Sequence, residues 1–171
     1  VGIFYYRYPG QQKGHISGIV SKEFLKVTGN GKSTITELLK SDPRGSVYLQ
    51  SHAKINENEL TQVPDKGKIT IVSPYGNHAR GSLFLDDSHL ADPALSEQLD
   101  KIADKIPEFY FGRLDIRFRD WETLKKGEDY SLIEVNGAGA EPTHMYDPRH
   151  SIFFAWKEIT RHWGIMNKIS R

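Results

Sequence analysis

Cysteine is absent from the 171 residues of this chain. Its absence excludes disulfide bridges, zinc sites built on thiolates and cysteine nucleophiles. No apolar run approaches the roughly 20 residues that a membrane-spanning helix needs, and Val1–Phe4 lacks the basic flank and cleavage pattern of a signal peptide. We therefore expect a cytoplasmic protein with no membrane partner.

The chain also lacks an excess of charge. Its 23 basic and 22 acidic residues nearly cancel, with a net charge of +1 and no long block of one sign. This balance predicts that nucleic acid is not a partner. A length of 171 residues predicts one domain over 1–171. Because Val1 already lies beside a β-rich run, we expect the chain to be a fragment of a longer one.

Local patterns predict hairpins mixed with helices. The expected strands are residues 3–8, 15–25, 68–72 and 82–85, followed by one at 113–118 and one near 133–136. The expected helices begin near 33, at the Asp92 cap and near Pro148, whereas 44–63 is expected to be irregular or weakly helical. This order lacks the regular alternation of a doubly wound sheet. It predicts an α+β fold with a mostly antiparallel sheet packed with helices.

Two strand-like stretches carry the polar side chains of greatest chemical interest. Side chains on a strand alternate between its faces, so Arg113, Asp115 and Arg117 share one face. The same count places Glu134 and Asn136 together on the second stretch. If the strands pair, carboxylate and amide oxygens gather beside guanidinium groups, which suits a magnesium–phosphate complex.

The opposite faces of these strands are apolar. Leu114 and Ile116 on the first strand, and Ile133 and Val135 on the second, are expected to face a core. An alternative interpretation of the polar face is a solvated cross-strand network of salt bridges, which would contribute little net energy.

With these motifs in view, the chain resembles the C-terminal part of the ATP-grasp domain of carboxylate–amine ligases such as D-alanine–D-alanine ligases and cyanophycin synthetase. The resemblance rests on Gly-Arg-Leu-Asp at 112–115, Glu-Val-Asn-Gly at 134–137, Lys-Glu at 22–23, the segment 27–35, and a Gly-Asn-His-Ala-Arg-Gly loop at 76–81. It covers nearly the whole chain. It identifies a superfamily and no substrate.

The resemblance implies an activity and a cofactor set. Such ligases use ATP to convert an acid to an acyl phosphate, which an amine attacks, and they release ADP. By this resemblance, Asp115 would hold one magnesium ion, Glu134 would bridge two, and Asn136 would complete the second. Arg113 would be the catalytic residue that stabilises the transferring groups.

Other residues receive expected roles from the same resemblance. Lys22 would bind the nucleotide phosphates, Arg80 would bind a substrate carboxylate or a phosphate, and His144 would lie with Glu141 near the attacking amine. The partners would be a small carboxylate and an amine, such as amino acids or short peptides. The upstream lobe, which would bind adenine, is expected to precede Val1, so the isolated fragment is expected to be inactive. The oligomeric state stays open, a homodimer included.

Two further classes of function stay open. The chain could belong to a regulatory or scaffold module that binds nucleotide without ligase turnover. Alternatively, its acidic face could bind a cation such as calcium.

Several other patterns have simpler interpretations. The segment 29–34 lacks the first glycine of a P-loop, because that position is Lys26, so a turn and helix cap are expected. No histidine pair has zinc-ligand spacing beside a third ligand. Trp156 and Trp163 are expected to contact the core along the last helix, and His162 is expected to be at the surface or partly buried. For His144, a loop histidine whose hydrogen bonds are satisfied within the chain is the preferred interpretation.

Overall fold

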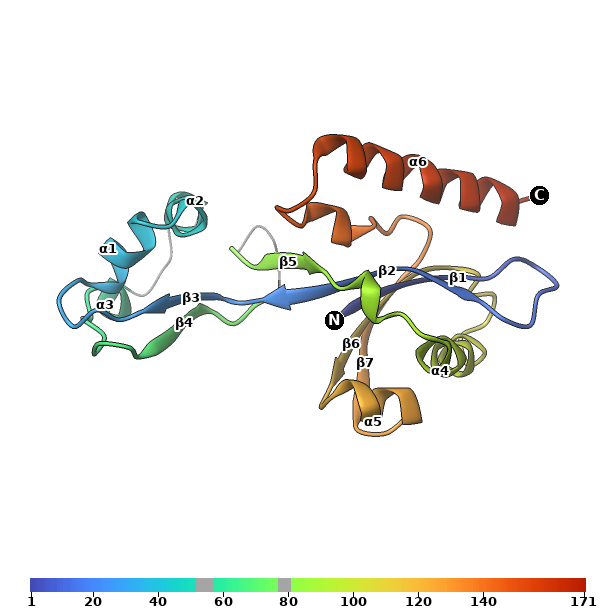
Figure 1. The fold of residues 1–171 in the computed structure, drawn as a ribbon, viewed down its shortest axis with the longest axis horizontal. Coiled ribbons are helices and arrows are strands. Elements are labelled where there is room, and N and C mark those ends of the chain that lie inside the picture. The colour runs from blue at the N-terminus through green and yellow to red at the C-terminus, as the bar shows by residue number, and fades with distance from the viewer. Residues whose placement is uncertain (52–56, 77–80) are drawn as a thin grey trace. The chain divides into compact units, whose positions relative to one another are not determined.

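The computed structural model of the chain describes residues 1–51, 57–76 and 81–171, which form an α+β fold (Figure 1). The described residues divide into two compact units. The first contains Val1–Ser21 and Phe84–Arg171, and the second contains Lys22–Leu83.

The first unit is built on a five-stranded sheet whose order is β5-β2-β1-β6-β7. The pairings of β1 with β2, β1 with β6, and β6 with β7 are all antiparallel. This confirms the predicted sheet type and the predicted first hairpin. The strands are β1 (Gly2–Tyr6), β2 (His15–Glu23), β5 (Leu83–Asp86), β6 (Phe111–Phe118) and β7 (Tyr130–Asn136).

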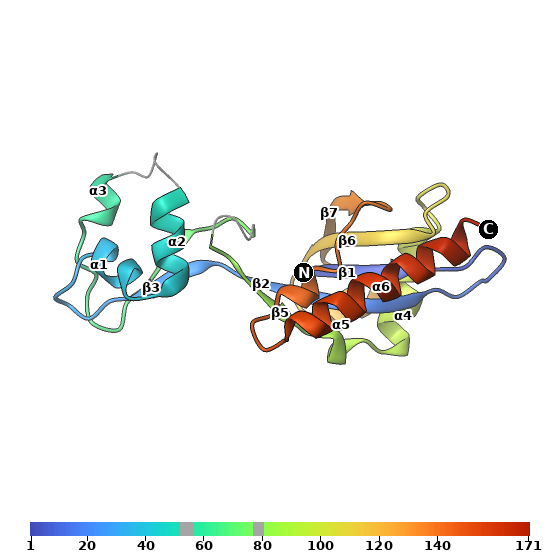
Figure 2. The ribbon, with the colours of Figure 1, turned by 90° about the horizontal axis from the view of Figure 1, so that it is seen from above.

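Helices cover both faces of this sheet (Figures 1 and 2). One face packs on α4 and α5 through a core that includes Ile3, Leu99 and Leu114. The other face packs on α6 through a smaller cluster centred on Phe4 and Ile165. The helices are α4 (Pro93–Ala103), α5 (Trp121–Lys126) and α6 (Ile152–Ile169), with short 3-10 turns η2 (Ser88–Leu90) and η3 (Thr143–Tyr146).

The start of α4 follows directly from its sequence. Asp92 caps the helix by accepting a hydrogen bond from the backbone N–H of Leu95 at 2.8 Å, and Pro93 occupies the first turn. Leu95, Leu99 and Ile102 are buried along one side. The predicted cap and apolar stripe are both confirmed.

The second unit contains a two-stranded antiparallel sheet and three short helices. Thr34 and Glu37 form the predicted capping box, each side chain bonding the other residue's backbone N–H. Leu25 and Leu39 lie in the core of this unit. Its elements are β3 (Leu25–Thr28), α1 (Ile35–Lys40), α2 (Pro43–Ser51), α3 (Glu57–Leu60) and β4 (Ile69–Ser73), so helical turns occupy much of the region expected to be irregular or weakly helical.

The prediction for the last helix was wrong in its orientation. Trp156 and Trp163 are 58% and 63% exposed in this chain, whereas Glu158, His162 and Ile165 are buried. The buried positions follow helical spacing, but two of the three are polar. The apolar stripe that was expected to contact the core therefore lies on the exposed side of α6. His162, expected at the surface or partly buried, is buried.

The expectation that Ile133 and Val135 face a core was also wrong. They are 60% and 41% exposed. The reason is the position of β7, which forms one edge of the sheet and carries no buried residue. Within the described part of the chain, no helix is both long enough and apolar enough to cross a membrane.

Candidate functional site

The predicted polar residues of β6 and β7 meet across the sheet. Asp115 lies directly opposite Glu134, and Arg113 lies directly opposite Asn136. Directly opposed residues of an antiparallel pair project from the same face, with their Cβ atoms about 4.5–5.5 Å apart. The structure therefore brings together the four residues that spacing alone had placed on two separate strand faces.

A β-bulge ends this group. The register shifts between Asp115 and Ile116, so Ile116 pairs with Leu132 and Ile133 is the additional residue on β7. Arg117, beyond the bulge, pairs with Ser131 and is exposed. A bulge locally changes the direction and twist of its strand and often lies beside a functional site.

Arg113 links this part of the sheet to the loop after β7. Its Nε donates to Asp115 Oδ1 at 2.9 Å, and its Nη1 donates to the backbone oxygen of Glu141 at 3.2 Å. The two ion-paired side chains are only 15% and 12% exposed, respectively. This burial distinguishes the pair from the solvated surface network that the sequence also allowed, because water screens such a pair far less.

The residues present fit a divalent cation of the hard, oxygen-binding type. The oxygens of two carboxylates and one amide, those of Asp115, Glu134 and Asn136, form the donor set. Gly2 leaves room beside the first carboxylate, since a Cβ there would lie 2.9 Å from Asp115 Oδ1. Among the described residues, no three histidine, aspartate or glutamate side chains form a metal-binding group, so Asn136 and oxygens of a bound ligand would complete the coordination of any ion.

Two predicted site residues cannot be related to this group. Lys22 is in β2 but belongs to the second unit, where its side chain lies beside Gly76. Arg80 lies outside the described residues. Their predicted roles stay predictions.

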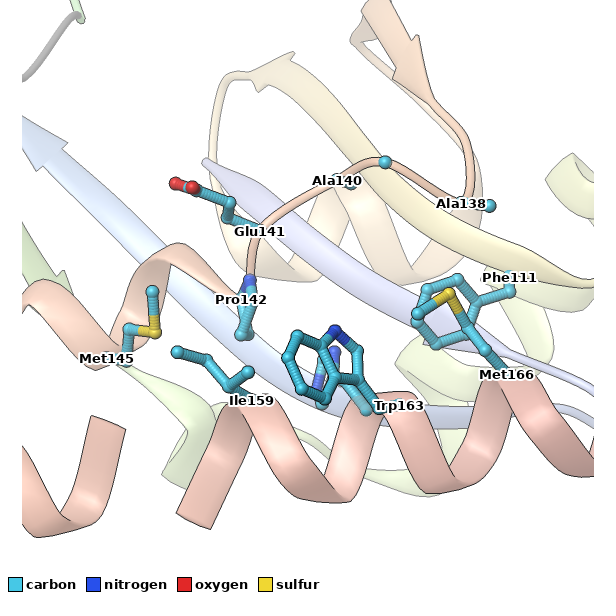
Figure 3. A pocket seen from close by; sticks show the side chains of 11 residues that line it. Phe111, Ala138, Ala140, Glu141, Pro142, Met145, Ile159, Trp163 and Met166 are labelled. Atoms are coloured by element: carbon cyan, nitrogen blue, oxygen red, sulfur yellow. The ribbon is translucent and has the colours of Figure 1, made fainter. Parts of the chain in front are cut away.

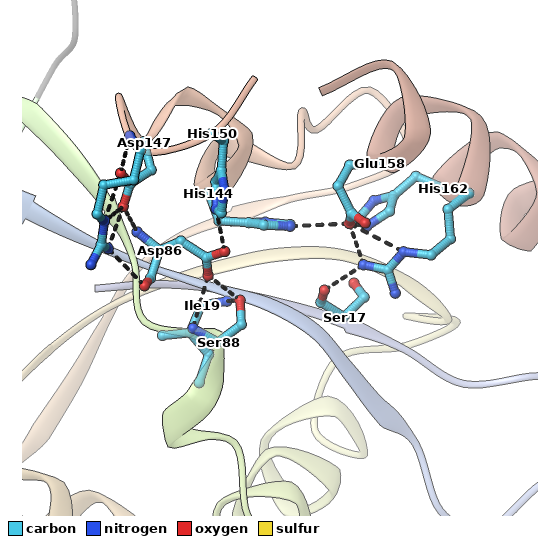
Figure 4. A network of polar contacts seen from close by, with 11 residues as sticks. Ser17, Ile19, Asp86, Ser88, His144, Asp147, His150, Glu158 and His162 are labelled. Carbon is cyan, nitrogen blue, oxygen red and sulfur yellow. Dashed lines mark hydrogen bonds and ion pairs between the residues drawn. The ribbon is translucent and has the colours of Figure 1, made fainter. Parts of the chain in front are cut away.

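His144 lies in η3 and is 3% exposed. Its Nε2 is 3.1 Å from Oε2 of Glu158, and its ring lies so close to β2 that a Cβ on Gly18 would be 2.2 Å from it. Arg161 donates to the same carboxylate and, at 2.6 Å, to the backbone oxygen of Ser17 (Figure 4). These contacts match the alternative in which the histidine is satisfied within the chain, and its binding of substrate stays a prediction.

Charge and burial act against each other at Glu158. Burial alone would raise the pKa of its carboxyl, but the hydrogen bonds from His144 and Arg161 outweigh burial and lower the pKa to about 2. The carboxylate is therefore ionised at neutral pH and holds η3 against α6. Glu158 and His162 are four residues apart on one side of α6, but this spacing does not by itself predict that the polar side is buried.

A second buried network fastens β5 to the segment before α6 (Figure 4). Asp86 Oδ2 is 2.7 Å from Nε2 of His150, and Asp86 Oδ1 accepts from the Ser88 hydroxyl at 2.5 Å. Asp147 accepts from the backbone N–H of Asp86 at 2.6 Å and pairs with Arg149, whose hydrogen bond holds the pKa of the aspartate well below its ordinary value. Sequence reasoning missed this network, because the contacts of Asp86 with His150 and Asp147 join residues more than 60 positions apart.

Comparison with known proteins identifies a similar fold but does not show a family. No family model matches the chain, and no curated protein sequence matches it. Among solved structures, the chain is similar to part of a bifunctional glutathione synthetase from Pasteurella multocida, with a TM-score of 0.53 and 12% identity over 95% of this chain. The chain spans about a quarter of that protein, 24% of its length. At this identity the similarity concerns the fold alone.

Proposed function

We propose that this chain carries the metal- and phosphate-binding half of the site of an ATP- and magnesium-dependent carboxylate–amine ligase. Such an enzyme joins an acid to an amine through an acyl phosphate and releases ADP. The observation that carries the proposal is the pairing of Asp115 with Glu134 beside Arg113 and Asn136. The similarity of the fold to part of a glutathione synthetase supports it.

In this proposal the residues of the β6–β7 pair have different roles. Asp115, Glu134 and Asn136 would hold the two magnesium ions. Bound magnesium would neutralise charge between the β- and γ-phosphates of ATP, and phosphoryl transfer depends mainly on such positioning and charge stabilisation. Both carboxylates project from adjacent strands of one sheet, so the chain needs no large rearrangement to present them together.

Arg113 is the proposed catalytic residue. A guanidinium carries five N–H donors in a fixed plane, so it can keep its contacts with Asp115 and Glu141 and still donate to a developing oxyanion. Those two contacts fix the orientation of the plane. Removal of one preorganised donor of this kind typically costs about 3–4 kcal/mol of transition-state stabilisation.

The remaining roles extend this proposal to the substrates. Lys22 would contact the phosphates, and Arg80 would bind the substrate carboxylate or a phosphate. Since His144 is buried against Glu158, we propose that it supports the loop that approaches the amine. Amino acids or short peptides are the proposed substrates, and a lobe outside this chain would bind the adenine.

The test is magnesium-dependent release of ADP by the full-length protein that contains this chain, supplied with pooled amino acids and short peptides. Glu134→Gln keeps the size of the side chain and removes its charge, so it should abolish release. Glu128→Gln, an exposed glutamate just before β7, is the matched control and should leave release unchanged. Tight magnesium-dependent nucleotide binding without release in any pool would instead favour a regulatory module, and absent nucleotide binding would overturn the proposal.

A further inference from the structure

A cavity of about 280 Å³ lies in the first unit, between α6 and the loop that follows β7 (Figure 3). Phe111 of β6 forms one side of it, and Ala140 and Pro142 contribute from the loop. Ile159 and Trp163 contribute from α6. The cavity thus adjoins the loop whose backbone Arg113 contacts.

The lining of the cavity is mostly apolar. Glu141 and His162 are the ionisable residues of its lining. The carboxylate of Glu141 accepts a hydrogen bond from the hydroxyl of Tyr146 at 2.8 Å, and Figure 3 shows it turned away from the ring of Trp163. A charged ligand group would therefore lose its hydration without gaining a counter-charge.

His162 gives this wall an uncharged polar group. The residue is 2% exposed, its ring packs edge-on against Phe4 with 4.3 Å between ring centres, and neither ring nitrogen has a hydrogen-bond partner. Burial, assisted by the charge of Arg161, lowers its pKa to about 4, so the imidazole is neutral at physiological pH. Both ring nitrogens are buried, and Nε2 lies 3.9 Å from Oε2 of Glu158, so neither nitrogen is presented to a ligand in the cavity.

The position of the cavity relates it to the candidate site. The backbone oxygen of Glu141, a lining residue, accepts the hydrogen bond from Arg113 Nη1 at 3.2 Å. A molecule that filled the cavity would thus contact the same loop residue that orients the proposed catalytic guanidinium.

We propose that this cavity binds an uncharged hydrophobic side chain of the substrate, either aromatic or branched aliphatic. This inference rests on the proposed function, because it names the substrate class of that site. The volume of about 280 Å³ lies below the roughly 300–1,000 Å³ of pockets for drug-sized ligands. It suits one side chain and is too small for a nucleotide.

The sequence provides a direct probe of this cavity. The chain contains two methionines, Met145 and Met166, and both line the cavity. In protein labelled with [13C-methyl]methionine, the signals of these two residues therefore report on the cavity. We would titrate it, without nucleotide, with benzyl alcohol, benzoate and benzylamine, which share one ring and differ in charge.

We expect saturable shifts of both methyl signals with benzyl alcohol, and at least tenfold weaker binding of the two charged probes. Ile159→Trp fills the cavity from α6 and should abolish the saturable shift. Lys157→Trp, at an exposed position on the same helix, should retain it. Ala140→Leu fills the cavity from the loop and serves if the first variant does not fold. Three results would overturn the proposed binding of a hydrophobic group in the cavity. They are equal binding of the charged probes, absence of a saturable shift, and retention of the shift in the filled variants.

A second arm separates this inference from the proposed function. If the full-length protein releases ADP, substrates with hydrophobic side chains should support release at least tenfold better than charged ones, and Ile159→Trp should raise their KM with little change in kcat. Release without this preference would overturn the substrate class while the ligase stands. Methyl shifts in a protein that binds no nucleotide would retain the pocket but overturn the substrate role that we assign to it, together with the ligase proposal.

Discussion

Asp115 and Glu134 lie directly opposite each other on neighbouring strands, one step before the bulge that ends their register. Two carboxylates on adjacent strand positions repel each other unless a cation or a hydrogen bond compensates them. Arg113 compensates the charge of Asp115, because its Nε donates a hydrogen bond to Asp115 Oδ1 at 2.9 Å. The pair therefore has the charge arrangement of a site that gains stability from a bound cation.

A double-mutant cycle tests whether both carboxylates hold the same metal. We expect Asp115→Asn and Glu134→Gln each to weaken magnesium or manganese binding at least tenfold, and the double variant to lose little more than either single one. Residues that act as one unit are non-additive in this way. Binding would be measured by calorimetry in the presence of ATP, with Glu128→Gln as the control. Strictly additive losses would contradict a shared ion.

We expect arginine to be specifically required at position 113. Arg113→Lys keeps the charge, but an ammonium cannot reproduce the planar contacts with both Asp115 and the Glu141 backbone. Because hydrogen bonds to charged groups contribute about 1.5–3 kcal/mol, we expect ADP release to fall at least tenfold. Arg117→Lys on the same strand is the matched control, since Arg117 is exposed. Equal effects of the two substitutions would show that only net charge on β6 matters.

Gly2 is a small residue with a steric consequence for the site. A Cβ at this position would lie 2.9 Å from both Asp115 Oδ1 and Val20 Cγ1. Gly2→Ala should therefore displace the carboxylate and weaken metal binding by about three- to tenfold, while the glycine-to-alanine change itself is mild for a strand. Metal titration of Gly2→Ala beside Gly164→Ala, an exposed glycine of α6 whose Cβ would meet no atom of another element within 4 Å, would check this. Unchanged metal binding in Gly2→Ala would show that Asp115 needs no such room.

The local rules of sequence predicted most of the elements and the pairing of the candidate site. Thr34 with Glu37, and Asp92 before Pro93, are caps that act within one helical turn, so their sequence determines them. Alternation on the strands likewise placed Arg113 with Asp115 correctly. These features depend on neighbours within a few residues.

The features that sequence reasoning missed depend on distant partners. Burial of His144 requires Glu158 on another element and the absence of a side chain at Gly18, more than 120 residues away. The exposure of Trp163 follows from which side of α6 packs on the sheet, and periodicity alone does not decide that choice. Ile133 is exposed because β7 is an edge strand, a property of the sheet order.

Burial of His162 predicts a pH-dependent stability. Its pKa is about 4 in the folded chain and about 6.5 in the unfolded chain, so the unfolded state binds more protons between these values. The contribution of the neutral His162 to the free energy of unfolding is therefore present above about pH 6.5 and is lost as the pH falls toward 4. At pH 5 this loss is about 2 kcal/mol. Glu158, whose folded pKa is about 2, loses its contribution only below its unfolded pKa near 4.5, so pH 4.5–6.5 reports mainly on His162.

His162→Phe isolates this contribution, because phenylalanine keeps an aromatic ring against Phe4 and cannot be protonated. We expect a free energy of unfolding within about 1 kcal/mol of wild type at pH 7, and about 2 kcal/mol above wild type at pH 5. Urea unfolding at both pH values measures the difference, and His89→Phe, at an exposed position, should retain the wild-type slope. If the free energy of unfolding of His162→Phe still falls from pH 7 to pH 5 as in wild type, the acid sensitivity belongs to another group. That result would show that the His162 imidazole is protonated in the folded chain.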